Sequence, residues 1–203
     1  MGKPHRPSEE KTPPDSNDRP YVSRGGNKLA AALDAFELKT AGQVCADLGS
    51  NVGGFVDCLL GREAKRVYAV DTGYGVLAYK LRIDTRVSVL ERANAMHVTL
   101  PEPVDLVTID TGWTRQEHVL PNAAKMLKPG GRIVTLIKPH YEARPEQLRD
   151  GVLDPETARS VLAETLDRIR AAGLKVHRVI ESPITGRKGN IEFLALLSPQ
   201  ITF

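Results

Sequence analysis

The chain has 203 residues with 28 lysines and arginines against 25 aspartates and glutamates, and this net charge of +3 permits a nucleic-acid partner without requiring one. The length suits one α/β domain, and two cysteines are too few for a disulfide framework. Because the sequence contains neither an apolar run of ~18 residues nor a signal-peptide core, we expect a cytoplasmic protein with no membrane partner.

The first twenty residues differ in composition from the rest of the chain. They contain five prolines, mixed charges and almost no large apolar side chain. Such a segment cannot bury enough surface to offset the entropy lost on ordering. We therefore expect residues 1–20 to be a disordered leader and residues 21–203 to form one domain, which begins with an amphipathic helix at 28–38.

Apolar strand patterns then alternate with helix patterns. The alternation is typical of βαβ units and a parallel sheet covered on both faces. The clearest helix is residues 154–173, which has an acidic start and a basic, glycine-terminated end. The sequence predicts an α/β fold with a seven-stranded, mostly parallel sheet that ends in an antiparallel hairpin. The expected strands are residues 43–49, 66–71, 86–91, 104–110, 132–138, 175–184 and 190–198.

The segment DLGSNVGGF, residues 47–55, follows the first expected strand and opens a helix. Gly49 lets a ligand approach the backbone, and Gly53 and Gly54 favour close helix packing with free amides at the helix N-terminus. This is typical of a nucleotide site, although Asn51 interrupts the G-x-G-x-x-G pattern. The candidate cofactor-binding residues here are Asp47, Gly49, Ser50, Gly53, Gly54 and Phe55.

A second acidic residue strengthens the prediction of a nucleotide site. Asp71 ends the second expected strand, where it can accept hydrogen bonds from both hydroxyls of a ribose. NAD and S-adenosylmethionine both fit these features. A Rossmann dehydrogenase does not usually close with a hairpin such as residues 175–198, which favours S-adenosylmethionine.

Seven segments carry a resemblance to a known family, and they follow one another in the family's order across roughly residues 21–197. They are YVSRGGNKLAAALDAF, DLGSNVGGFVDCLL, RVYAVDTGYGVLAYKLR, VDLVTID, LKPGG, IKPHYEA and SPITGRKGNIEFL. The chain resembles the FtsJ-like ribose 2′-O-methyltransferases, and within them the TlyA or haemolysin A branch. The resemblance implies a class I, Rossmann-like S-adenosylmethionine-dependent methyltransferase fold, S-adenosylmethionine as cofactor and ribosomal RNA as substrate. It also places Asn94 beside the adenine, where an ordinary turn asparagine is the alternative.

The family carries a Lys-Asp-Lys-Glu catalytic tetrad. By the resemblance its members are Lys28 in SRGGNKL, Asp110 in VTID, Lys138 in LIKP and Glu192 in GNIEFL. Charged residues at strand ends are often merely solvated, but four of them at the ligand edge of one sheet suit methylation of a ribose hydroxyl. That reaction needs an oxygen aligned with the methyl group and loss of the hydroxyl proton. A lysine can orient the oxygen or take the proton, and both roles stay open.

Positive charge and aromatic rings accompany the tetrad. Arg24, Arg187 and Lys188 come from segments expected at the same sheet edge, and their charge suits a phosphodiester backbone. Trp113 and Tyr141 suit stacking on an unpaired base. Ordinary surface or packing roles are the alternative for each. The histidines show no shared metal spacing, so no metal is expected.

Two departures from the family pattern bear on the substrate. The branch usually carries an RNA-binding S4 domain, whereas only the leader precedes YVSRGG here, so we expect RNA affinity to come from elsewhere. The family loop Val-Ser-Phe-Ile-Ser after the catalytic aspartate reads TGWTR, residues 111–115, in this chain. Three alternatives to RNA methylation therefore stay open: methylation of a small hydroxylated substrate, a non-catalytic binder of S-adenosylmethionine or RNA, and an NAD enzyme. The sequence makes no prediction of oligomeric state.

Overall fold

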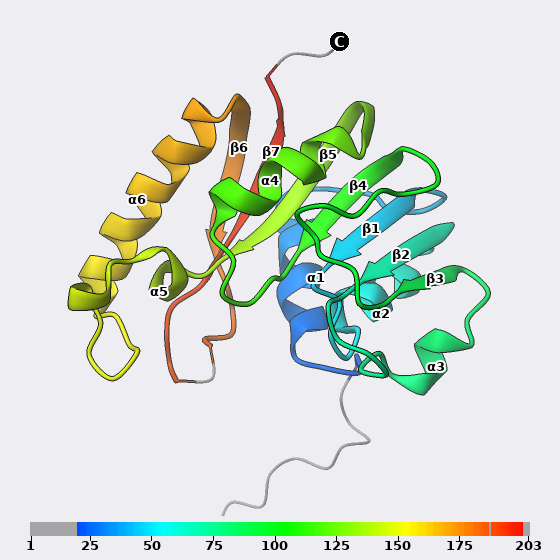
Figure 1. Ribbon diagram of the computed structural model, residues 1–203, viewed down its shortest axis with the longest axis horizontal. Coiled ribbons are helices and arrows are strands. Elements are labelled where there is room, and N and C mark those ends of the chain that lie inside the picture. Colours follow the sequence, from blue (N-terminus) through cyan, green and yellow to red (C-terminus); the bar gives the residue numbers. More distant parts are fainter. Residues whose placement is uncertain (1–19, 187, 201–203) are drawn as a thin grey trace, which may run out of the picture.

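One sheet of seven strands forms the centre of the computed structural model, which describes residues 20–186 and 188–200 (Figure 1). The strand order is β3-β2-β1-β4-β5-β7-β6. The first five strands in this order are parallel, and β7 is antiparallel to both β5 and β6. The predicted sheet with its C-terminal hairpin is confirmed. The strands are β1 (Val44–Leu48), β2 (Arg66–Val70), β3 (Val87–Leu90), β4 (Val104–Ile109), β5 (Leu127–Ile137), β6 (Leu174–Glu181) and β7 (Phe193–Pro199).

Helices cover both faces of the sheet. Helices α1 (Gly25–Ala35) and α2 (Gly54–Gly61) lie on one face, and α4 (Gln116–Lys125) and α6 (Pro155–Ala171) lie on the other. Successive residues of a strand point to opposite faces, so every residue of β1 is buried between two helical layers. This explains why the strands are continuous apolar runs rather than alternating ones. The loops contain short helices at α3 (Tyr79–Arg82), α5 (Pro139–Glu142) and a 3₁₀ turn at Pro145–Gln147.

Three element boundaries differ from the expected ones. Helix α1 starts at Gly25 instead of residue 28, because two glycines of its first turn allow other segments to approach closely. Strand β5 starts at Leu127, which pairs with Val104 of β4, instead of at residue 132. The β6–β7 hairpin loop is longer than expected, because Pro183 has no N–H to donate to the ladder and β6 ends before it.

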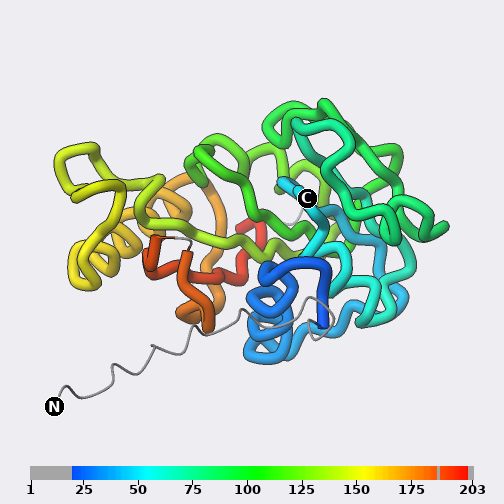
Figure 2. Tube along the Cα trace, turned by 90° about the horizontal axis from the view of Figure 1, so that it is seen from below, coloured from blue at the N-terminus to red at the C-terminus, as the bar shows by residue number. Residues whose placement is uncertain are grey.

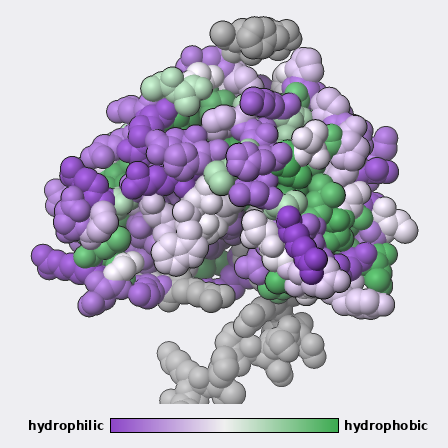
Figure 3. Space-filling view, in the orientation of Figure 1, coloured by the Kyte–Doolittle hydropathy of each residue, from purple (hydrophilic) through white to green (hydrophobic). Residues whose placement is uncertain are grey.

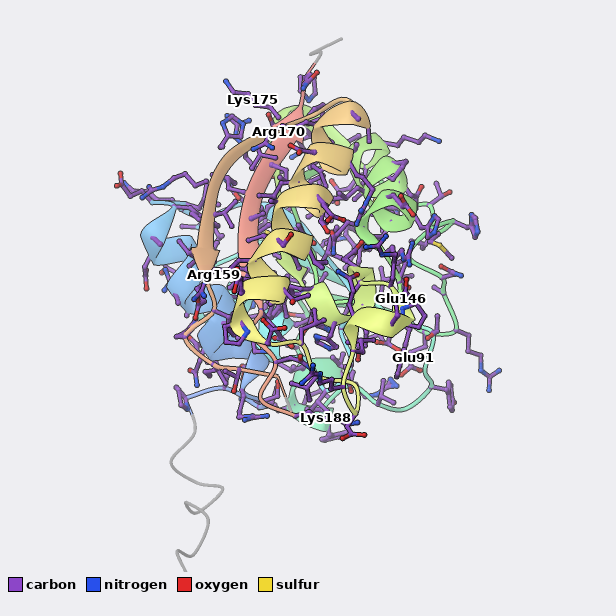
Figure 4. All side chains as sticks on the ribbon, turned by 90° about the vertical axis from the view of Figure 1, so that its left-hand side faces the viewer. Glu91, Glu146, Arg159, Arg170, Lys175 and Lys188 are labelled. Carbon is purple, nitrogen blue, oxygen red and sulfur yellow. The ribbon has the colours of Figure 1, made fainter. Side chains whose placement is uncertain are left out.

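Helix α6 covers the outer part of the sheet. Its N-cap Asp154 accepts hydrogen bonds from the backbone amides of Glu156 (3.1 Å) and Thr157 (3.0 Å). Figure 4 shows the side chains of Arg159 and Arg170 on this helix, and Figure 3 shows that hydrophilic side chains dominate its half of the surface. None of the described helices has the length and apolar character to cross a membrane. The predicted leader lies outside the described residues except for Pro20, and so does Arg187.

Candidate active site

A cleft of about 720 Å³ lies at the carboxyl ends of β1, β4 and β5. Parallel strands bring their carboxyl ends to one edge of the sheet, where ligands of open α/β folds bind. Figure 2 views the molecule from this side, with the connecting loops toward the reader. The cleft is lined by most of the predicted site residues: Arg24, Lys28, Asp47, Gly49, Ser50, Gly54, Phe55, Asp110, Trp113, Lys138, Tyr141, Lys188 and Glu192.

Lys138 and Asp110 form one ion pair at the centre of the cleft. They directly follow the adjacent parallel strands β5 and β4, so their Cα atoms emerge side by side. The Lys138 Nζ lies 2.6 Å from Asp110 Oδ1 and donates a hydrogen bond of 3.2 Å to the carbonyl of Thr111. Both side chains are largely buried, which strengthens their attraction over that of a surface pair.

Lys28 and Glu192 form a second ion pair, with 2.5 Å between Nζ and Oε2. Lys28 projects from α1, and Glu192 directly precedes β7; in Figure 2 the blue α1 and the orange-red segment before β7 lie side by side. Only 4% of the Glu192 side chain is exposed. A Cβ atom on Gly186 would lie 2.7 Å from Glu192 Oε1, so a glycine at this position leaves room for the carboxylate.

Close packing of α1 against α2 sets the position of Lys28. A Cβ atom on Gly54 would lie 2.2 Å from Ser23 Oγ and 2.8 Å from the backbone nitrogen of Gly26. These glycines therefore let the first turns of the two helices touch. The structure thus brings all four predicted tetrad residues into one cleft as two ion pairs, next to the glycine loop. Their catalytic roles stay a prediction.

Asp47 is the buried carboxyl of the glycine loop. The Thr108 hydroxyl donates to its Oδ1 over 2.7 Å, while Oδ2 is buried without a hydrogen-bond partner among the described residues. The pKa of Asp47 is raised to about 8: burial is the main cause, the nearby carboxylates of Asp110 and Asp71 act in the same direction, and the hydrogen bond from Thr108 acts against them. An unpaired carboxyl oxygen at the cleft calls for a donor on the ligand, such as the ammonium group of S-adenosylmethionine.

The backbone of the glycine loop is equally suited to a cofactor. Gly49 has a φ of +87°, and a Cβ atom on it would lie 2.6 Å from the carbonyl oxygen of Asp110, so this position requires glycine. The cleft volume is in the range of sites that bind small molecules and cofactors. The buried acceptor, the tight loop and the cleft together fit S-adenosylmethionine.

Three predicted cofactor residues do not line the cleft. The Asp71 carboxylate accepts hydrogen bonds from the amides of Asn51 (2.8 Å) and Gly73 (2.7 Å). Asn94 Oδ1 accepts a hydrogen bond of 2.9 Å from its own turn. Gly53, with a φ of +102°, caps α2. Carboxylate and amide oxygens each keep a free lone pair, and the cofactor contacts of these residues stay predictions.

An aromatic pair borders the mouth of the cleft. Trp113 is 86% exposed, and its ring centroid lies 4.8 Å from that of Tyr141. The Lys138 ammonium lies 5.7 Å from the Tyr141 centroid. Arg24 is exposed at the start of α1, and Lys188 donates a hydrogen bond of 3.0 Å to the carbonyl of Asp150. Figure 4 shows Lys188 at the lower end of the molecule, away from Lys175 and Arg170 at the upper end.

Some residues that line the cleft were not predicted from the sequence. His140 is one: burial and the charges of Lys138 and Lys28 lower its pKa to about 4, so its imidazole is neutral at physiological pH. Asn190 is another, and its side chain bonds the backbone of Gly151 and Leu153. Both lie two residues from a tetrad member, which was the available signal. Among the described residues, no cluster of His, Cys, Asp and Glu is suited to hold a metal.

Comparison with known proteins agrees with this geometry. The FtsJ-like methyltransferase family profile matches residues 21–198. The chain is 42% identical to the 16S/23S rRNA (cytidine-2′-O)-methyltransferase TlyA of Mycobacterium tuberculosis, an alignment covering 91% of this chain and 70% of TlyA. It spans 64 to 75% of the length of three such relatives, so it corresponds to part of each.

Solved structures share the fold. A Streptococcus thermophilus protein classed with the hemolysins superposes with a TM-score of 0.86 at 37% identity, covering 90% of this chain and 68% of that one. An S-adenosylmethionine-dependent methyltransferase from Listeria monocytogenes superposes with a TM-score of 0.65 at 12% identity, covering 88% of this chain and all of that one, which shows the fold alone. The predicted class I fold and cofactor are confirmed, and the NAD alternative is set aside. By its sequence, its sheet order and the cleft at the carboxyl ends of its strands, this chain belongs to the FtsJ-like methyltransferase family, whose cofactor is S-adenosylmethionine.

Proposed function

We propose that this chain methylates the 2′-hydroxyl of a ribose in RNA and that ribosomal RNA is its substrate. The observation that carries the proposal is the pairing of Lys138 with Asp110 and of Lys28 with Glu192 in one cleft beside the glycine loop. Such a set suits an oxygen nucleophile that must be oriented and deprotonated, and it is unnecessary for an amine that is already nucleophilic. The name of the TlyA relative, a cytidine 2′-O-methyltransferase of ribosomal RNA, supports the same assignment.

The glycine loop and its neighbours hold the cofactor. Asp47 accepts from its ammonium group, and the backbone at Gly49 and Gly54 approaches it closely; Ser50, Gly53, Phe55, Asp71 and Asn94 complete the proposed set. When bound, S-adenosylmethionine supplies an electrophilic methyl group on a sulfonium sulfur. The protein must then place the ribose oxygen in line with that methyl group, because alignment contributes a large part of the rate enhancement in such reactions.

Lys138 orients the ribose oxygen. The ion pair with Asp110 and the hydrogen bond to the Thr111 carbonyl fix its ammonium group, which can still donate an N–H to the substrate. As the new C–O bond forms and the methyl–sulfur bond breaks, the hydroxyl proton becomes acidic, and the O–H electron pair stays on the oxygen. The proton passes to Lys138 if the side chain is a neutral amine, or to the Asp110 carboxylate after bond formation. Lys28 and Glu192 flank this centre, so that two positive and two negative side chains compensate each other in the cleft.

RNA binds across the mouth of the cleft. Trp113 is too exposed to serve as core packing, and with Tyr141 it offers a surface on which an unpaired base stacks. Such stacking contributes ~1–3 kcal/mol per base. Arg24 and Lys188 contact phosphates and supply the salt-dependent part of the affinity, and Arg187, which lies outside the described residues, belongs to the same predicted set. This exposed aromatic and basic rim favours RNA over a small hydroxylated substrate.

Methyl transfer to RNA tests the proposal. The purified protein is incubated with labelled S-adenosylmethionine and ribosomal RNA from cells that lack the gene, and digested nucleosides are analysed by mass spectrometry. We expect label on a ribose, in a nucleoside whose base is unmodified. Label on a base, or transfer to small hydroxylated compounds with none to RNA, would overturn the proposal; binding without any transfer would make the chain a non-catalytic binder.

A further inference from the structure

A polar cluster that is mostly buried adjoins the cleft and is not part of its lining. It consists of Gln116, Thr135 and Glu142, which are buried, and Arg168, whose side chain is 36% exposed, and we refer to these four residues as the Gln116 clasp. Thr135 Oγ1 donates to Gln116 Oε1 over 2.7 Å, and Gln116 Nε2 donates to the carbonyl of Leu136 over 3.4 Å. The Gln116 amide donates to Glu142 Oε1 over 2.8 Å, and Arg168 Nη2 donates to Glu142 Oε2 over 3.1 Å.

The clasp joins the segments on both sides of Lys138. Thr135 precedes Lys138 in β5, and Glu142 follows it at the end of α5. Both bind Gln116, which is the first residue of α4 and directly follows the loop 111–115. The other end of this loop is bound by Lys138 itself, through Asp110 and the Thr111 carbonyl. The loop that carries Trp113 is therefore attached to the Lys138 segment at both ends.

Because most of the clasp is buried, its polar groups need well-placed hydrogen-bond partners within the protein. Only 2% of the Glu142 side chain is exposed, and Thr135 and Gln116 are buried as well. A buried carboxylate must be paired and hydrogen-bonded, and here the Arg168 guanidinium and the N-terminal amide of α4 do this. Shifting α4 relative to β5 would break several of these bonds together. The clasp thus holds the first residue of α4, which follows the Trp113 loop, against the strand and the short helix on either side of Lys138.

We propose that Glu142 and Gln116 are positioning residues for methyl transfer, which act by holding the Asp110–Lys138 pair and the Trp113 loop in register with each other. The inference rests on the proposed function and deepens it, because neither residue lines the cleft. Arg168 of α6 neutralises Glu142 and so connects the outer helix to the site. Small displacements of an aligned nucleophile lower rates strongly, and the hydrogen bonds of the clasp do not involve residues 47–55, so loosening the clasp lowers turnover more than it lowers cofactor affinity.

The test uses two mild substitutions in the full chain, Thr135→Val and Glu142→Gln. Each removes one interaction of the clasp and changes side-chain volume little. The matched control is Thr40→Val, which removes a buried hydroxyl bonded to the Arg62 carbonyl, far from the cleft. Thr135→Ser restores the hydroxyl. Trp113 is the single tryptophan of the chain, so its emission anisotropy reports the loop directly.

We expect Thr135→Val and Glu142→Gln to lower kcat for RNA methylation by about 10-fold or more and to lower Trp113 anisotropy, with cofactor affinity within about twofold of wild type. Thr40→Val should change none of these quantities, and Thr135→Ser should recover most of kcat. If kcat or Trp113 anisotropy in the two clasp variants matches that of Thr40→Val, the inference is wrong. If wild-type protein methylates no RNA, the proposed function fails, whereas the anisotropy and cofactor affinity still test whether the clasp holds the loop.

Discussion

At the scale of single residues, Asp47 shows how the site is prepared for a cationic ligand. Its carboxyl is fully buried, and one oxygen has no partner among the described residues. Burial raises its pKa to about 8, so in the free protein the group is largely protonated at neutral pH. A ligand ammonium would favour the ionised form, because an opposite charge at short range lowers the pKa of a carboxyl. Cofactor binding and ionisation of Asp47 are thus coupled.

The raised pKa of Asp47 predicts a pH dependence of stability. Between pH 4 and about 8 the folded state holds one more proton than the unfolded state, so the free energy of unfolding falls as the pH rises, by up to about 1.4 kcal/mol per pH unit. His140 has a folded pKa of about 4, so its contribution to the free energy of unfolding increases with pH up to pH 6.5. Above pH 6.5 this contribution is nearly constant. The free energy of unfolding, measured with denaturant between pH 6.5 and 8, should therefore fall more steeply with pH for wild type than for Asp47→Asn.

Asparagine is a suitable replacement because its carbonyl oxygen still accepts from the Thr108 hydroxyl. The two proteins should then differ only in the titrating group. Equal slopes in wild type and Asp47→Asn would show that Asp47 ionises normally and is not prepared for a ligand in this way.

At the scale of elements, the contact between the first turns of α1 and α2 determines where Lys28 lies. Gly54 fits against Ser23 and the backbone of Gly26 with no space for a Cβ atom. The contact explains the glycine at position 54, which adjoins Gly26 in the fold although the two are 28 residues apart in the sequence. Close helix packing of this kind fixes the backbone position of Lys28 beside the cofactor loop.

Gly54→Ala tests the importance of this contact. The added methyl group meets backbone atoms that cannot rotate away, so we expect a loss of about 1–3 kcal/mol in the free energy of unfolding and a displaced Lys28 with reduced methyl transfer. Gly61→Ala is the matched control in the same helix, because nothing lies within 4 Å of its Cβ position and alanine is the better helix former. Similar stabilities of the two variants in urea would contradict the packing argument.

Elements built from local patterns were predictable from the sequence, and their exact ends were less so. The strands β1, β2 and β4 coincide with the expected runs to within one or two residues, because each is buried on both faces and reads as an apolar run. The start of β5 was missed because Pro129 and Gly130 argue against a strand, although Leu127 pairs with Val104. The first turn of α1 was missed because glycine disfavours a helix unless packing requires it.

At the scale of the whole molecule, the site is assembled from distant parts of the chain. Lys28 and Glu192 are 164 residues apart in sequence and 2.5 Å apart between their charged atoms. No local pattern indicates that contact, and only the resemblance to a family suggested it. The Gln116 clasp was missed for the same reason, because Gln116 lies 26 residues from Glu142 in a segment with no distinguishing motif. Side-chain networks across elements are where sequence patterns carry least information.

The division of the cleft into a cofactor side and a lysine side predicts that binding and chemistry separate. Lys138→Met keeps an apolar side chain of similar length and removes the ammonium group that pairs with Asp110. S-adenosylmethionine at 100 times its Kd should still stabilise this variant by about 2.7 kcal/mol, as in wild type. Methyl transfer should fall by about 100-fold or more. Thermal shift and single-turnover assays give the two quantities, and a variant with full activity would remove Lys138 from the mechanism.

The central claim, that the acceptor is a ribose hydroxyl, is tested most directly by a transcript with one 2′-deoxy nucleotide at the methylated position. Its phosphates and bases are unchanged, so its salt-dependent binding and its effect on Trp113 emission should match those of the unmodified transcript. We predict that the unmodified transcript accepts one methyl group and the deoxy transcript accepts none. Methyl transfer to the deoxy transcript at the normal rate would contradict the account, because the methyl group would then go to a base or to another hydroxyl.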